Sequence, residues 1–295
     1  MNDSHTNTVY IAEALRRYPD VFKRITEQLT MNGIDVHIIS GTKNVWCRDW
    51  MPVQTPGGFV KFTYKGYGML EKYPQLRVDE HCWGDFADAF RSDIILDGGN
   101  VVRWGDRVLM TDIVFTHNPG YDRTLLRDTL SDLLEAEIIF LPVEPGDTLG
   151  HTDGIVRWID QGAVLLNYYL CMCGPEKVDY WMEVSEILGD NGIRSVPMTC
   201  GCQYEPEMTE EQFRKEYPEA DDFNSAVGYY CNFLQVKGLI LYPTFDLWMD
   251  LEAEERLAAT FPDVTIRAVD CSRLAMEGGC VNCVTANYVM PEKPA

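Results

Sequence analysis

The sequence predicts an α/β protein, because short strand-like runs alternate with helical runs along most of its length. Four segments each read as two short strands joined by a tight polar turn, and helical runs separate most of them. Hydrophobic residues make up 46% of the 295 residues, which is too apolar for a disordered acidic chain. Since no stretch reads as a linker, we expect one domain over residues 1–295.

The expected helices place their apolar residues on one face. Residues 10–30 do so with Ala12, Leu15 and Ile25, and Pro19 marks a break or a fresh start. Three further amphipathic helices are expected, at residues 122–135, 176–189 and 247–260. Single strands are expected between them, at residues 34–40, 137–141 and 264–269.

The four expected hairpins recur along the chain, and each turn contains glycine, which supplies the positive φ that hairpin turns need. They cover residues 51–64, 100–111, 155–169 and 231–245, and a fifth strand is expected over 281–285. Recurrence of one supersecondary unit favours a repeat architecture such as a propeller. An ordinary α/β domain with several hairpins fits the spacing equally well.

The chain carries 25 Lys and Arg against 46 Asp and Glu, which gives a formal net charge of −21. Such a surface repels the phosphates of nucleic acids and anionic membranes, and it favours cationic partners. No apolar run approaches the roughly 20 residues that span a bilayer, and no basic segment precedes an apolar one at the N-terminus. We therefore expect a cytoplasmic protein without nucleic-acid or membrane partners, and the base rate for soluble proteins favours a homodimer.

Ten cysteines in such a protein are expected to be reduced thiols. The pairs Cys171/Cys173 and Cys200/Cys202 have one intervening residue, whereas zinc sites usually have two to four. Buried thiols that act as small apolar groups are the favoured interpretation, and a zinc protein is the alternative. The acidic stretch 205–222 is expected to be a solvated surface excursion, with a cation-attracting lid as the alternative.

Unusual polar residues gather at the starts of the hairpins and in the fifth strand. They lie in the segments 46–49, 97–100, 150–154 and 277–283, and Asn232 lies inside the fourth hairpin. If the hairpins surround a common axis, these residues converge at one end of it. The set offers carboxylates, one His and Cys candidates, but it contains no phosphate loop and no dinucleotide motif.

Such a set suits covalent catalysis on a cationic carbon. Carboxylates pair in a bidentate way with a planar guanidinium, and a thiolate attacks its central carbon. Of the five His, His151 is the best candidate for an acid/base, because Asp153 follows it closely between glycines. Each acid also has an ordinary structural explanation: Asp49 as the partner of a neighbouring Arg, Asp97 as a turn cap, and Asp112 as a strand end.

Together these segments resemble the agmatine deiminase and bacterial (Porphyromonas-type) peptidyl-arginine deiminase family. The matching stretches are Trp46-x-Arg48-Asp49-x-x-Pro52, Asp97-Gly98-Gly99-Asn100, Gly150-His151-x-Asp153 and Glu277-Gly278-Gly279-x-x-x-Cys283-x-Thr285. They occur in the family's order and cover residues from about 40 to 290. The resemblance implies the pentein fold of the guanidine-modifying enzymes, a five-bladed α/β-propeller built from pseudo-fivefold ββαβ repeats.

The resemblance also implies roles at the matching positions. Cys283 would be the nucleophile, His151 the acid/base, and Asp49 and Asp153 the ligands of the guanidinium. Asp112 falls where the family usually has a Glu that pairs with the guanidinium and the His. The further expected substrate-binding residues are Trp46, Asp97, Tyr230, Asn232 and Gly279.

The expected activity is hydrolysis of a guanidine to a ureido product and ammonia through a covalent thiouronium on Cys283, without a metal or organic cofactor. Asp97 replaces the family's common Glu, and Asn282 stands where the agmatine enzymes usually have His. Because these departures lie near the substrate tail, the substrate stays open between agmatine, free arginine and peptidyl-arginine. The alternatives are amidino transfer to an amine and a catalytically silent guanidinium-binding protein.

Overall fold

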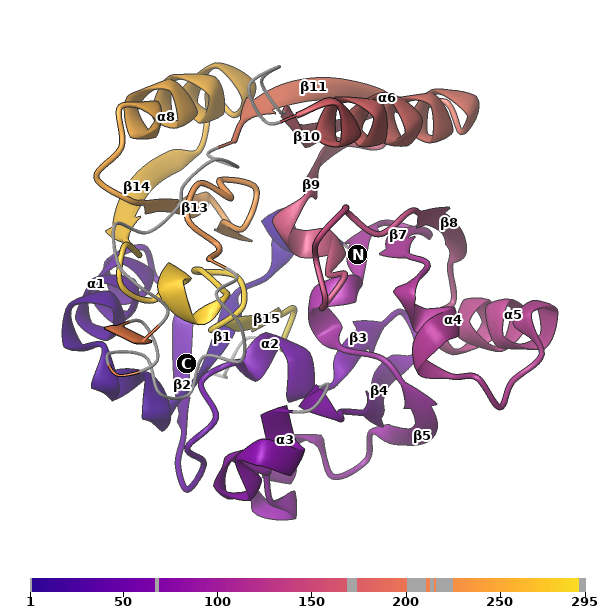
Figure 1. Ribbon diagram of the computed structural model, residues 1–295. Coiled ribbons are helices and arrows are strands. Elements are labelled where there is room, and N and C mark those ends of the chain that lie inside the picture. Colours follow the sequence, from indigo (N-terminus) through magenta and orange to yellow (C-terminus); the bar gives the residue numbers. More distant parts are fainter. Residues whose placement is uncertain are drawn as a thin grey trace.

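The structure, a computed structural model, describes residues 2–66, 69–168, 174–200, 211–212, 215 and 225–291. Within these residues the strands form five three-stranded sheets. Figure 1 shows the sheets placed around the middle of the molecule, with the longer helices toward the outside. These helices are α1 (Pro19–Met31), α5 (Arg123–Leu134), α6 (Pro175–Asp190) and α8 (Met249–Thr260).

Four of the sheets are built from consecutive strands, and each consists of a hairpin followed by a parallel third strand. They are β3 (Val53–Thr55), β4 (Gly58–Thr63) and β5 (Phe90–Ile95); β6 (Val102–Trp104), β7 (Arg107–Thr111) and β8 (Glu137–Leu141); β9 (Val156–Asp160), β10 (Ala163–Tyr168) and β11 (Arg194–Thr199); and β12 (Leu234–Val236), β13 (Leu239–Thr244) and β14 (Thr265–Asp270). A parallel partner needs a crossover, which helices supply in each unit. The four expected hairpins are confirmed.

The fifth sheet joins the two ends of the described chain. Its central strand β1 (Thr8–Ala12) is parallel to β2 (Asp35–Ile39) and antiparallel to β15 (Ala286–Tyr288). Helix α1 is the crossover between β1 and β2. This sheet therefore has the same strand directions as the other four, with its hairpin partner supplied from near the C-terminus.

Two of the expected elements differ in the structure. The helix expected over residues 10–30 was wrong only in its first residues: β1 extends to Ala12, whereas η2 (Glu13–Arg17) is helical and α1 makes the fresh start expected at Pro19. All five residues of β1 are buried, so this segment has no exposed helical face. The strand expected over 281–285 is a series of turns, in which the hydroxyl of Thr285 donates to the carbonyl of Val281 at 2.8 Å. The strand that follows, β15, is the one that pairs.

The remaining expected helices and strands are confirmed to within about two residues. Asp122 caps α5, since its Oδ1 accepts hydrogen bonds of 3.0 Å from the backbone N–H of Thr124 and of Leu125. The short helices are α2 (Cys47–Trp50), α3 (Met69–Lys72), α4 (Ile113–His117) and the 3-10 turns η1 (Asp3–His5), η2 (Glu13–Arg17), η4 (Pro74–Leu76), η5 (Glu80–Phe86), η6 (Gly98–Asn100), η7 (Thr152–Gly154) and η9 (Ala275–Glu277).

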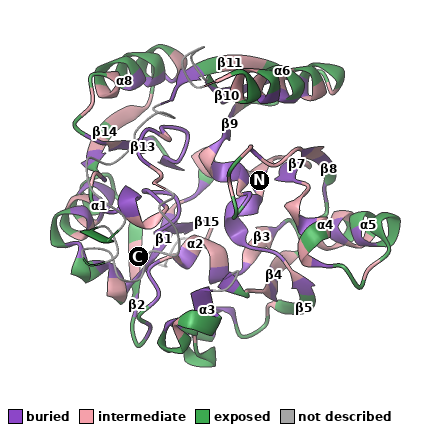
Figure 2. Ribbon diagram, in the orientation of Figure 1, coloured by how far each residue is buried: buried purple, intermediate pink, exposed green. Residues whose placement is uncertain are grey.

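Burial follows this arrangement, with buried strands toward the middle and exposed helix faces at the periphery (Figure 2). The largest apolar cluster joins β1, β13, α1 and α8. Polar side chains are also buried near the middle, among them Asp97 and Asp153, each 2% exposed. Buried charges need partners, so these positions point to a functional site.

Among the described residues, no helix combines the length and the apolar character that crossing a membrane requires. Cys171, Cys173 and Cys202 lie outside the described residues, as does most of the acidic stretch 205–222. Cys200 is described and buried.

Candidate active site

Short helical turns carry the motif segments, and each leads into the first strand of a hairpin. Turn α2 precedes β3, η6 precedes β6, and η7 precedes β9. Turn η6 packs against both α2 and η7. The polar segments of three successive units therefore meet, as expected from their shared position before the hairpins.

His151 lies between two carboxylates. Its Nε2 is 3.3 Å from Asp97 Oδ2, and its Nδ1 is 3.6 Å from Asp49 Oδ1. Burial by itself lowers the pKa of His151, but the charges of Asp49 and Asp97 outweigh it and raise the pKa to about 10. The ring is therefore an imidazolium at neutral pH.

The two carboxylates beside His151 are shifted toward their neutral forms. Burial, with help from Asp97 and Asp153, raises the pKa of Asp49 to about 7 against the opposing effect of His151. Burial also raises the pKa of Asp97, while its hydrogen bond with His151 lowers it. A further cation entering the cluster would stabilise the ionised carboxylates.

The paired glycines of η6 allow this close approach. A Cβ on Gly99 would lie 2.7 Å from Asp49 Oδ1 and 2.8 Å from His151 Nδ1. A Cβ on Gly98 would collide with the backbone carbonyl of Arg48. The Gly99 N–H also donates to Asp49 Oδ1 at 3.1 Å, so the backbone itself holds this carboxylate.

Asp153 lies on the other side of the cluster, beside the proposed nucleophile. Its Oδ2 accepts a hydrogen bond of 2.6 Å from Asn282 Nδ2, and Cys283 Sγ lies 4.0 Å from the same oxygen. The guanidinium of Arg48 donates to Asn282 Oδ1 at 3.1 Å. Arg48 thereby fixes which end of the amide faces Asp153.

Asn232 holds the turn that carries Cys283. Its Oδ1 accepts from the backbone N–H of Asn282 at 3.2 Å and of Cys283 at 3.4 Å. Its Nδ2 lies 3.2 Å from Cys283 Sγ, where it donates a hydrogen bond to the sulfur. Asn232 therefore lies beside Cys283 in the structure.

The surroundings of the Cys283 thiol favour its neutral form. Burial first, and then the charges of Asp153 and Asp49, raise its pKa well above the ordinary value, while the hydrogen bond from Asn232 opposes them. Cys283 retains 7% exposure, whereas the neighbouring Cys280 is fully buried and its Sγ faces the carbonyl of Ala226 at 3.6 Å. Of these two thiols, Cys283 is the one open to a ligand.

Gly279 and Trp46 border the thiol. A Cβ on Gly279 would lie 2.5 Å from the Trp46 ring and 3.1 Å from Cys283 Sγ. Glycine at this position therefore lets the indole approach the sulfur, so both expected substrate-binding residues lie beside Cys283.

The family model for the Porphyromonas-type peptidyl-arginine deiminases matches residues 4–288 of this chain. The chain belongs to this family. A curated relative, the agmatine deiminase of Pseudomonas aeruginosa, is 27% identical over 219 residues, which are 68% of this chain and 59% of the relative. The match therefore spans less than two thirds of that relative's length.

Solved structures share the family's pentein fold. A Cys-to-Ser variant of C. jejuni agmatine deiminase with substrate bound has a TM-score of 0.75 at 15% identity, covering 98% of this chain and 96% of the other. A DDAH variant from Pseudomonas aeruginosa complexed with citrulline has a TM-score of 0.57 at 10% identity, covering 96% and 100%. At these identities the likeness shows the fold.

In this member of the deiminase family, Asp112 does not contact His151. The Asp112 side chain is 42% exposed and forms an ion pair of 3.7 Å with Arg123. It follows β7 at the start of α4, where its backbone N–H bonds to Leu141. The contact with the His that the resemblance implied for Asp112 is instead made by Asp97.

Tyr230 also points elsewhere. It is fully buried, and its hydroxyl donates to Asp250 Oδ1 at 2.7 Å near the start of α8. Its ring packs against Phe245 in the apolar cluster. We therefore place Tyr230 in the core of this deiminase-family chain and not among the residues that contact Cys283.

A metal ion is a poor fit to the same cluster. Among the described residues, Asp49, Asp97 and His151 offer ligand atoms within 4.8 Å of one another. A ligating imidazole must be neutral, however, and the two flanking carboxylates favour the protonated ring. The arrangement suits an organic cation that the carboxylates can bind.

Two residues of the site were missed as functional candidates. Asn282 contacts Asp153, and Arg48 contacts Asn282, so both act on the geometry of the carboxylate. Each lies inside a matching stretch, directly beside Cys283 or Asp49. Position within the motif was the available signal, because nothing in the sequence shows that the two side chains meet.

Proposed function

We propose that this protein is a deiminase that hydrolyses a guanidine, agmatine or an arginine derivative, to a ureido product and ammonia. The observation that carries the proposal is the thiol of Cys283 beside Asp153, in one cluster with a His151 imidazolium held by Asp49 and Asp97. The curated relatives named as agmatine deiminases support this reaction class.

Asp49 and Asp153 bind the guanidinium between them. Each is buried and has one oxygen held, by the Gly99 N–H or by the Asn282 amide, so both are oriented before the substrate arrives. The incoming cation lowers the pKa of Cys283, because it offsets the two carboxylates that raised it. The thiol then loses its proton to solvent, and the bound substrate assists its own attack.

The Cys283 thiolate attacks the central guanidinium carbon, and a C–S bond forms as the π electrons move to nitrogen. The His151 imidazolium protonates one amino nitrogen, the C–N bond breaks, and ammonia leaves. A thiouronium remains on Cys283. The neutral His151 then deprotonates water, which attacks the same carbon; the C–S bond breaks, and the ureido product and the thiolate are released.

The architecture and setting form part of the same proposal. The five sheets are the blades of an α/β-propeller, and residues 1–295 form one catalytic domain in which the motif turns meet at one end of the propeller axis. The enzyme acts in the cytoplasm on a small cationic substrate as a homodimer. It uses no metal and no organic cofactor.

A product screen tests the proposal. The purified protein is incubated with agmatine, free arginine and an arginine peptide, and ammonia and ureido product are measured, with an added amine to reveal amidino transfer. We expect equal amounts of ammonia and ureido product from at least one guanidine. Turnover is lost in Cys283→Ser and retained in the matched control Cys280→Ser.

Two results would redirect the proposal. A new guanidino product formed from the added amine would indicate amidino transfer. No turnover of any guanidine by folded protein, together with guanidinium binding that survives Cys283→Ser, would identify a silent binding protein.

A further inference from the structure

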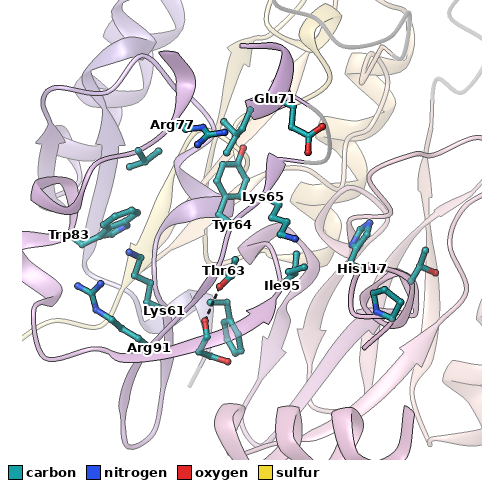
Figure 3. Close-up of a pocket in the computed structure, with 16 residues that line it drawn as sticks. Lys61, Thr63, Tyr64, Lys65, Glu71, Arg77, Trp83, Arg91, Ile95 and His117 are labelled. Atoms are coloured by element: carbon teal, nitrogen blue, oxygen red, sulfur yellow. Dashed lines mark hydrogen bonds between the residues drawn. The ribbon is translucent and has the colours of Figure 1, made fainter. Parts of the chain in front are cut away.

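A cavity of about 890 Å³ lies beside the sheet of β3, β4 and β5, and Figure 3 shows its sixteen lining residues. Four of them are Lys or Arg and one is acidic, although the whole chain has 25 Lys and Arg against 46 Asp and Glu. The charged lining residues are Lys61, Lys65, Glu71, Arg77 and Arg91. The cavity is therefore basic within an acidic protein.

Two of these cations already contact the same carboxylate, that of Glu80. Arg91 donates to both of its carboxylate oxygens, at 2.9 and 2.5 Å. Lys61 Nζ lies 3.6 Å from the same carboxylate and 3.0 Å from the centre of the Trp83 ring. These contacts occupy Lys61 and Arg91 at one end of the cavity.

Lys65 and Arg77 differ from Lys61 and Arg91 in their contacts. Both are exposed, and neither side chain makes a hydrogen bond or an ion pair within the part of the chain that the structure describes. In Figure 3, Lys65 reaches into the space between Tyr64 and His117, and Arg77 lies on the other side of Tyr64. Two cations thus face the cavity, and among the described residues neither forms an ion pair with Glu71, the acidic residue of the lining.

The cavity adjoins the candidate active site in two places. Tyr64 lines it and packs with Trp46 on one small apolar cluster, and Trp46 borders the thiol of Cys283. On the opposite side the cavity is lined by His117. His117 ends α4, and α4 packs against the residue before His151, since a Cβ on Gly150 would lie 2.9 Å from Ile113 Cβ. Burial, and then the positive charge of His151, lower the pKa of His117 to about 4.

We propose that this cavity receives the far end of the guanidine substrate, and that this end carries a carboxylate attracted by the positive charges of Lys65 and Arg77. The inference rests on the proposed function, because it takes the guanidinium to lie between Asp49 and Asp153. Lys and Arg form charge-assisted hydrogen bonds with carboxylates, whereas an ammonium tail would meet two like charges. The substrate class is therefore a guanidine acid and not agmatine.

A matched pair of substrates tests the charge of the tail. Agmatine and 5-guanidinopentanoate have the same methylene chain and end in an ammonium and a carboxylate respectively. We expect kcat/KM to be higher for the carboxylate. The expected difference shrinks as salt is added, because exposed charge pairs are screened.

Variants test the two residues. Lys65→Gln and Arg77→Gln should each lower the ratio of kcat/KM for the carboxylate over the ammonium roughly fivefold, the upper range for an exposed ion pair. Lys65→Glu, which reverses the charge, should lower the ratio further. If Lys65→Glu fails to fold, Lys65→Gln and Arg77→Gln still test the proposal. Lys23→Gln on α1, which removes the same charge from an exposed position, should leave the ratio unchanged.

Two outcomes would overturn the inference while leaving the deiminase proposal intact: a wild-type preference for agmatine, or a ratio that the Lys65 and Arg77 variants do not change. If the folded protein turned over neither compound, and neither arginine nor an arginine peptide, the proposed function and this inference would both be overturned.

Discussion

The side-chain amide of Asn282 donates a hydrogen bond of 2.6 Å to Asp153 Oδ2, and Arg48 holds the opposite end of the same amide. Both side chains of the Asn282–Asp153 pair are almost fully buried. A buried hydrogen bond to a charged group contributes about 1.5–3 kcal/mol, so the amide matters for how Asp153 is held.

Asn282→Ala should therefore weaken guanidine binding. Asp153 would lose a donor and its fixed orientation, which raises KM about 10- to 100-fold, while kcat falls less because Cys283 and His151 remain. Steady-state kinetics measure the split. Asn191→Ala, which removes a capping amide at the end of α6, serves as the control, and equal effects of the two variants on KM would contradict this role.

Asp97 and Asp112 are distinguishable by substitution. Asp97→Asn removes a carboxylate from His151 Nε2, which should lower kcat at least ~100-fold, whereas Asp112→Asn changes only an exposed pair with Arg123 and should alter kcat less than about fivefold. The loss of a neighbouring negative charge lowers the pKa of His151, so the alkaline limb of the Asp97→Asn profile moves to lower pH. If Asp112→Asn lowered kcat more than Asp97→Asn did, the acid that acts with His151 would be Asp112 and not Asp97.

The Cys283 thiol should titrate in response to a cation. Burial, Asp153 and Asp49 raise its pKa well above the ordinary value, so the free protein should show little thiolate absorbance from Cys283 at neutral pH. A bound guanidinium should move the titration to lower pH and increase that absorbance. The difference between the wild type and Cys283→Ser isolates this signal, and a fully ionised Cys283 in the free protein at neutral pH would refute substrate assistance.

Gly99→Ala should lower kcat/KM, because the added methyl group would displace side chains of the candidate site. The added Cβ would lie within 2.8 Å of both Asp49 Oδ1 and His151 Nδ1, so the carboxylate and the ring must shift. A displacement of this size is expected to cost about 100-fold in kcat/KM. Gly84→Ala, where a Cβ meets nothing within 4 Å, should keep full activity, and an active Gly99→Ala protein would contradict the described geometry.

The sequence predicted the elements that a short stretch of residues specifies by itself. The hairpins β3–β4, β6–β7, β9–β10 and β12–β13 were found because each turn contains a glycine between apolar runs. Strand β1 was missed because it is buried on both faces and lies at the centre of its sheet, so its pattern has no alternation. The burial of such a strand depends on partners far along the chain.

The candidate site shows the same limit. The motifs brought Asp49, His151, Asp153 and Cys283 into one cluster as expected. Which acid faces His151 depends on how the turns pack, and a spacing argument could not choose between Asp97 and Asp112. The turn at Cys283 is likewise held by Asn232, a tertiary contact that overrides the strand propensity of residues 281–285.

The pairing of β15 with β1 has a consequence for the order in which the candidate site forms during folding. It joins Ala286–Tyr288 to Thr8–Tyr10, so almost the whole chain must be in place before the pair forms. Contacts this distant in sequence form late, because the entropy of closing the loop must be overcome first. Cys283 lies just before this strand, and a refolding chain should therefore regain most of its helices before Cys283 takes its place beside Asp153.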